Sequence, residues 1–106
     1  VPSYTQSQTL ELHQRGLTVA EIAQKRGFSL NTIISHLAEL IEMNQPVDLT
    51  QMVSPEQQLA IMQAIQAVGA QSLKSIYEYL KERYTYDEIK LVRAWWRREN
   101  KSDRAI

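Results

Sequence analysis

The chain of 106 residues contains no cysteine, only three glycines and three prolines, and no long apolar run. The absence of cysteine excludes disulfides and thiolate chemistry, and it is compatible with a reducing cytoplasm. Each glycine stands alone at a predicted helix end, so there is no glycine-rich phosphate-binding loop. No apolar segment approaches the length that crosses a bilayer, and no signal-peptide pattern opens the chain. We therefore expect a soluble cytoplasmic module without membrane contact.

The chain also lacks net charge and the residue groupings of common enzymes. Its twelve basic and twelve acidic residues cancel, so the chain as a whole has no long-range attraction to nucleic acid. The two histidines, His13 and His36, lie on different predicted helices without a paired His–Glu spacing that would hold a metal. We expect no catalytic residue, metal or cofactor in this domain. Because it begins with Val1 rather than methionine, we expect a fragment of a longer polypeptide.

Helical patterns dominate what is present. An apolar fraction of 43% is enough for a core. Cap residues and apolar spacing predict six helices, at Ser3–Arg15, Val19–Arg26, Leu30–Met43, Pro55–Val68, Leu73–Arg83 and Tyr86–Glu99. The connector over residues 44–53 could include a brief extended stretch at 47–49. We predict an all-α fold: a compact bundle of about six helices that contains a helix-turn-helix, with a second helical hairpin packed on it. Residues 1–106 would form one domain, with a helix-turn-helix half at 1–46 and a second three-helix half at 54–99.

Apolar periodicity predicts which helix faces are buried. On the third helix the apolar residues fall within an arc of roughly 120°, and they are Leu30, Ile33, Ile34, Leu37, Leu40 and Ile41. On the fourth helix a stripe recurs every three residues, at Leu59, Met62, Ile65 and Val68. On the last helix we expect Ile89, Val92 and Trp96 to face the core.

Other aromatic residues leave alternatives open. Trp95 lies at the margin of the buried face, so it could pack, stack on an unpaired base or fill an interface pocket. Four tyrosines surround the second hairpin, where we expect them to seal the packing; they are Tyr77, Tyr79, Tyr84 and Tyr86.

The segment from Thr18 to Ile41 has the signals of two helices joined by a tight turn. Thr18 and Glu21 have capping-box spacing, and Ser29 can cap the helix that starts at Leu30. Gly27 falls where the backbone needs a left-handed conformation. A helix-turn-helix of this kind most often lays its second helix in a DNA major groove.

The predicted outer face of that second helix is polar, with Asn31, Thr32, Ser35, His36, Glu39 and Glu42. Asparagine can pair with adenine, and serine or threonine can bond to bases or phosphates. We therefore take Ser29, Asn31, Thr32, Ser35 and His36 as candidate DNA contacts, with Lys25 and Arg26 placed to reach phosphates. Against this interpretation, the helix has no lysine or arginine and its two glutamates would repel DNA. The alternative is a solvated polar face.

A second candidate surface lies on the last helix. Lys90, Arg93, Arg97, Lys101 and Arg104 would align within about 80° if the helix continued, and Arg98 lies beside them. Residues 90–104 carry a local charge of plus four, which could bind phosphates with strong salt dependence. The alternative is a solvated helix end, where cations suit the helix dipole.

The string LTVAEIAQKRGFSLNTIISHLAELIE, followed by VDL, SLKSIYEYL and YDEIKLVRA, resembles a known domain. It is similar to the helix-turn-helix domain at the C-terminus of RecQ-type ATP-dependent DNA helicases, from about Thr9 to Ala94. The resemblance implies a non-catalytic accessory module that helps to bind or position the DNA substrate, with DNA and the rest of the helicase chain as partners. It also implies a bacterial, nucleoid-associated location. Arg26 stands where DNA-reading hairpins usually have an apolar residue, which predicts looser packing there.

Two other functions remain open from the residues. The module could be a protein-interaction or spacer domain of the helicase without DNA contact. A free-standing transcription regulator would need a dimer interface, and the sequence shows no evident one.

Overall fold

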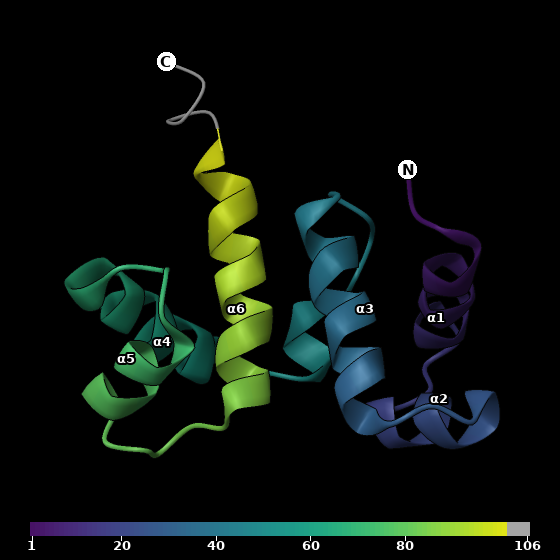
Figure 1. The fold of residues 1–106 in the computed structure, drawn as a ribbon, viewed down its shortest axis with the longest axis horizontal. Coiled ribbons are helices and arrows are strands. Elements are labelled where there is room, and N and C mark those ends of the chain that lie inside the picture. The colour runs from purple at the N-terminus through teal and green to yellow at the C-terminus, as the bar shows by residue number, and fades with distance from the viewer. Residues whose placement is uncertain (102–106) are drawn as a thin grey trace. The chain divides into compact units, whose positions relative to one another are not determined.

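The computed structural model describes residues 1–101, which form six α-helices and one short 3₁₀ helix, without a strand (Figure 1). The elements are α1 (Tyr4–Gln14), α2 (Val19–Arg26), α3 (Leu30–Glu42), η1 (Leu49–Gln51), α4 (Pro55–Val68), α5 (Leu73–Tyr79) and α6 (Tyr86–Glu99). The prediction of an all-α fold is confirmed. The chain divides into two units, Val1–Val47 and a second that starts at Asp48, and each is described here by itself.

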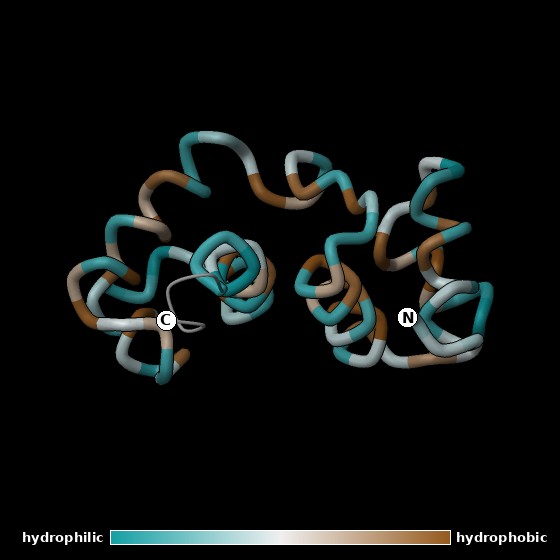
Figure 2. Tube along the Cα trace, turned by 90° about the horizontal axis from the view of Figure 1, so that it is seen from above, coloured by the Kyte–Doolittle hydropathy of each residue, from teal (hydrophilic) through white to brown (hydrophobic). Residues whose placement is uncertain are grey.

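The first unit is a three-helix assembly in which α1 and α2 both pack on α3. Figure 1 shows α2 crossing one end of α3 at a steep angle. Its core includes five fully buried aliphatic side chains, Ile22, Ile33, Leu37, Leu40 and Ile41. Along single helices in Figure 2, apolar and polar positions alternate within a turn, as expected when one helix face packs and the other is solvated.

Local side-chain caps set the helix-turn-helix, as the sequence predicts. The backbone N–H of Glu21 donates to Thr18 Oγ1 (3.1 Å), and the Thr18 N–H donates to Glu21 Oε1 (2.8 Å). Gly27 ends α2 in the left-handed region, with φ of 70°. Ser29 Oγ then accepts from the backbone N–H of Thr32 (3.1 Å) and starts α3. Each such cap stabilises its helix by about 1 kcal/mol.

The second unit packs α4, α5 and α6 against one another. Its core includes Ile61, Ile65, Ile76, Ile89 and Val92. The rings of two of the tyrosines, Tyr77 and Tyr86, stack with centroids 4.3 Å apart. Tyr77 is half-buried, whereas Tyr86 remains 43% exposed and Tyr79 54% exposed, so the expected sealing of the packing is confirmed only in part.

Two predicted segments differ from the structure. The stretch at 47–49 is extended at Asp48 but forms no strand, because Leu49 begins the 3₁₀ turn η1. Helix α5 ends at Tyr79 rather than Arg83, since Lys81 and Glu82 adopt left-handed φ values of 57° and 60°. Neither residue is a glycine or proline, so nothing in the sequence marks the turn that leads into α6.

Several apolar positions predicted to be buried are exposed. Leu30 is 53% exposed because it is the first residue of α3 and lies beyond the packing of α1 and α2. On α4 the predicted stripe is wrong at both ends: Leu59 is 54% exposed and Val68 is 42% exposed. Ile65 of the predicted stripe is buried, and Ile61 and Ala64 are buried with it.

On α6 the predicted core face is confirmed in part. Ile89 and Val92 are fully buried, whereas Trp96 is only half-buried, as Trp95 also is. None of the helices in residues 1–101 has the length and apolar character needed to cross a membrane.

Candidate nucleic-acid interface

The helix-turn-helix is exposed at its turn and at the start of α3, as well as along one side of α2. Asn31 is exposed on the first turn, and the capping residue Ser29 is exposed before it. The side chains of Ser29 and Thr32 hydrogen-bond to each other (2.9 Å), so Thr32 supports the turn. Ser35, one turn further, is half-buried. Among the predicted contacts on α3, Asn31 is therefore the most accessible.

His36 is half-buried rather than fully exposed as expected, because one edge of its ring lies against α1. His36 Nδ1 lies 2.9 Å from Thr9 Oγ1, and the ring meets Phe28 edge-on with centroids 6.0 Å apart. Burial lowers the pKa of His36 and the nearby Arg26 guanidinium lowers it further, while Glu39 opposes the shift. His36 thus helps to pack the first unit together.

Arg26 also contacts the interior of the first unit, so the looser packing expected at this position is not found. Its Nη1 donates to the carbonyl oxygen of Thr5 (2.7 Å) and to Thr9 Oγ1. Its Nη2 donates to Thr5 Oγ1 (2.7 Å) and to Gln8 Oε1 (3.1 Å). The guanidinium also covers the Phe28 ring, with Cζ 4.7 Å from the centroid. The arginine fastens α2 to α1 through these bonds.

Thr9 connects the two groups. Thr9 is fully buried, and its hydroxyl can donate one hydrogen bond and accept two. Because the Arg26 guanidinium can only donate, Thr9 Oγ1 accepts from it, and the same oxygen also hydrogen-bonds to His36 Nδ1. This Thr9–Arg26–His36 network ties α1, α2 and α3 together.

The acidic end of α3 is partly directed toward α1. Gln6 Nε2 donates to Glu39 Oε1 (2.8 Å). Two exposed apolar side chains at the opposite end were not predicted from the sequence, Phe28 (40% exposed) and Leu30 (53% exposed). Their exposure could have been predicted from their positions on either side of the cap Ser29. Residues at the very start of a helix lie outside the turns that pack against other helices, so they do not join its buried face.

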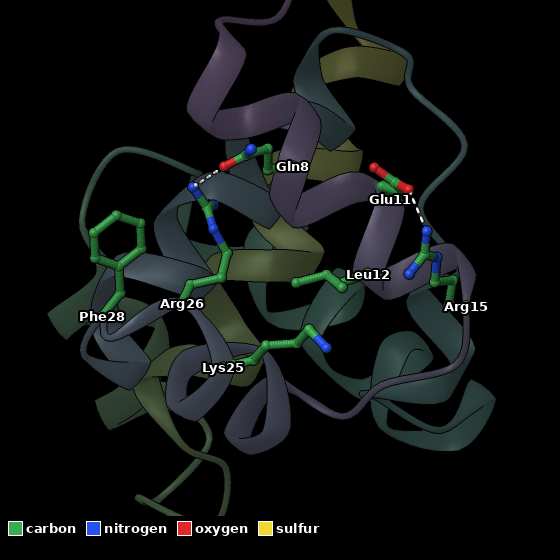
Figure 3. Close-up of a pocket in the computed structure, with 7 residues that line it drawn as sticks. All are labelled: Gln8, Glu11, Leu12, Arg15, Lys25, Arg26 and Phe28. Atoms are coloured by element: carbon green, nitrogen blue, oxygen red, sulfur yellow. Dashed lines mark hydrogen bonds and ion pairs between the residues drawn. The ribbon is translucent and has the colours of Figure 1, made fainter.

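A groove of about 500 Å³ lies between α1 and α2 (Figure 3). Its α1 side consists of Gln8, Glu11, Leu12 and Arg15, and its other side consists of Lys25, Arg26 and Phe28. In Figure 3, dashed lines join Arg26 to Gln8 and Arg15 to Glu11, and the Lys25 ammonium lies outside both pairs.

The basic surface predicted on α6 is partly used for packing in the second unit. Arg93 Nη1 and Arg97 Nη2 both donate to the carbonyl oxygen of Ala70, at 3.4 and 3.5 Å. This carbonyl follows the end of α4, where the helix dipole attracts cations. Arg98 pairs with Glu99 (3.0 Å).

The other members of this surface are differently placed. Lys90 is half-buried and Lys101 is exposed. Arg104 lies outside the described residues. Within residues 1–101, no three histidine or acidic side chains gather to hold a metal ion.

A family model for a helix-turn-helix domain matches residues 5–93. The chain belongs to this helix-turn-helix family. No curated protein and no solved structure gives a match. The family match extends from α1 into α6, so the helix-turn-helix domain includes helices of both units.

Proposed function

We propose that this helix-turn-helix domain binds duplex DNA through the N-terminal turn of α3. The observation that carries the proposal is the exposed Asn31 at the start of α3, directly after the cap Ser29. In this type of motif the first residues of the second helix contact base edges. The Asn31 amide can donate a hydrogen bond to N7 of adenine and accept one from its N6 amino group. This pair of bonds distinguishes adenine from the other bases.

The residues around Asn31 suit this contact. Leu30 offers an exposed apolar side chain for a thymine methyl group, and the Ser29 hydroxyl can bond a phosphate. Lys25, exposed at the end of α2, can neutralise a phosphate. The Thr9–Arg26–His36 network holds α2 and α3 against α1, and it thereby supports the turn that joins α2 to α3.

The charge of the first unit limits the affinity. Residues 1–47 contain three basic and four acidic residues, a net charge of minus one. With one or two phosphate contacts, log affinity would fall with log salt at a slope of about −1 to −2. This affinity is suited to a module that acts beside other DNA-binding parts of a longer chain. Together with the resemblance to the C-terminal domain of RecQ-type helicases, it supports an accessory role in positioning the substrate of such an enzyme.

A titration of fluorescent duplex DNA by anisotropy tests the DNA-binding proposal. Asn31→Ala should weaken binding by roughly tenfold, because a well-placed bidentate base contact contributes about 1–3 kcal/mol. Gln66→Ala, an exposed amide on α4, is the matched control and should bind as the unsubstituted protein does. Equal DNA affinities of the Asn31→Ala and Gln66→Ala proteins would refute the proposal that α3 contacts the DNA bases. The helicase role is tested separately, by measuring DNA unwinding by the parent chain with and without Asn31→Ala.

The alternative is a protein-interaction or spacer role without DNA contact. The net charge of minus one over residues 1–47 favours it, because this charge gives the first unit no overall attraction to DNA. Absence of duplex binding at low salt would support this function instead.

A further inference from the structure

The cations of the first unit are gathered at one place. All three lysine and arginine residues of positions 1–47 line the groove between α1 and α2: Arg15, Lys25 and Arg26. Glu11 is the one acidic residue that lines it, which leaves a local charge of plus two. The remaining residues of the unit carry three glutamates and no basic side chain. An anionic ligand would therefore be drawn to this groove and repelled from the rest of the unit.

The two outer cations are available to such a ligand. Lys25 is exposed and makes no hydrogen bond or ion pair with the described residues. Arg15 pairs with Glu11 (2.6 Å), but their side chains are 62% and 60% exposed. Ion pairs this exposed contribute little, so Arg15 can turn to a bound phosphate at small cost. Arg26, by contrast, is held by its bonds to α1.

The groove also offers an aromatic surface. Arg26 covers one face of Phe28, yet the residue remains 40% exposed, so ring surface is left for a ligand. Leu12 adds an apolar wall on the α1 side. A volume of about 500 Å³ is in the range of small-ligand sites. The groove therefore combines exposed cations with an aromatic ring, the two elements with which proteins hold unpaired nucleotides.

We propose that the groove between α1 and α2 binds one unpaired nucleotide of a DNA single strand. Lys25 and Arg15 contact the flanking phosphates, and the base stacks on the exposed surface of Phe28 that Arg26 leaves free at the edge of the groove. The proposal rests on the proposed DNA-binding function, and adds a single-strand site distinct from the duplex contact at Asn31. A domain with both sites would contact a junction between duplex and single strand, the substrate that an unwinding enzyme creates.

The test compares fluorescent twelve-nucleotide thymidine and abasic strands, which share phosphates but differ in bases. The thymidine strand should bind about five- to tenfold more tightly than the abasic strand, since one base–aromatic stack accounts for the difference. Phe28→Leu should abolish this preference while leaving abasic binding unchanged. Tyr79→Leu is the matched control, because Tyr79 is an exposed aromatic residue in the second unit. Thermal melts by circular dichroism establish that both variants fold.

Charge variants complete the test. Lys25→Gln should weaken binding of both strands by about two- to fivefold at low salt, whereas Lys74→Gln on α5 should not. Equal binding of the two strands, or an unchanged preference in Phe28→Leu, would overturn the proposal. The proposal would also be overturned if the protein bound neither strand but bound a peptide of aspartate and leucine in a manner that depends on Lys25. The effect of Asn31→Ala is measured with duplex DNA, and the effect of Phe28→Leu with single strands. A negative result for the single-strand site can therefore be distinguished from a negative result for the duplex contact.

Discussion

The buried Thr9–Arg26–His36 network makes a quantitative prediction for Thr9→Val. Valine keeps the shape of threonine but removes the hydroxyl that accepts from Arg26 and hydrogen-bonds to His36. A hydrogen bond to a charged group contributes about 1.5–3 kcal/mol and a neutral bond about 1 kcal/mol. Arg26 keeps three other acceptors, on Thr5 and Gln8, so part of its bonding survives. We expect the free energy of unfolding to fall by about 2–3 kcal/mol.

Urea denaturation of the whole chain measures this effect. Both tryptophans, Trp95 and Trp96, lie in α6, so tryptophan fluorescence reports the second unit. Far-UV circular dichroism reports both units, and its transition should move to lower urea in Thr9→Val. Coincident movement of the fluorescence transition would show that the units unfold together.

Two controls separate the network from simple packing. Thr9→Ser keeps the hydroxyl and removes one buried methyl group, so we expect a loss of about 1 kcal/mol. In a double-mutant cycle, Thr9→Val and Arg26→Met should be non-additive by 1 kcal/mol or more, roughly the energy of the bond they share. A cost below about 0.5 kcal/mol for Thr9→Val, or additive costs in the cycle, would refute the network as described.

Two further predictions concern pH and backbone strain. The pKa of His36 is lowered in the folded state, so the unfolded state binds the proton more tightly. Stability should be full above the ordinary histidine pKa of 6.5 and should fall as pH drops from 6.5 toward the folded-state pKa. Urea titrations at pH 7.5 and 5.5 measure this loss, and a His36→Gln protein that retained the whole of it would contradict the assignment. At the turn after α5, Lys81→Gly should raise the free energy of unfolding by about 0.5 kcal/mol, since glycine adopts a positive φ without strain. Glu78→Gly within α5 should lower it by about 1 kcal/mol, and thermal melts that rank the two variants the other way would count against strain at Lys81.

The structure changes how the helix-turn-helix is interpreted. Of the seven residues proposed from the sequence around α2 and α3, Arg26, Thr32 and His36 hold the fold through named bonds. Lys25 and Asn31 remain exposed. The candidate surface for DNA is therefore smaller than the sequence predicted, and it is concentrated at the turn and at the groove beside it.

The sequence by itself determined the helices and their caps, because these depend on residues three or four apart. Thr18 with Glu21, Gly27 and Ser29 mark the two helices and the turn through interactions within a single helical turn. The all-α fold follows from such local signals. The family match, which covers residues 5–93, agrees with the helix-turn-helix.

Only the tertiary structure decided what the polar side chains do. Thr9 lies 17 residues from Arg26 and 27 from His36, so no local pattern could reveal their shared hydrogen bonds. Likewise, α4 offers apolar residues on more than one side, and packing on α5 and α6 selected Ile61 and Ile65 over Leu59 and Val68. Whether a residue on an amphipathic helix supports the fold or meets a partner depends on which neighbours reach it, and that is a property of the assembled chain.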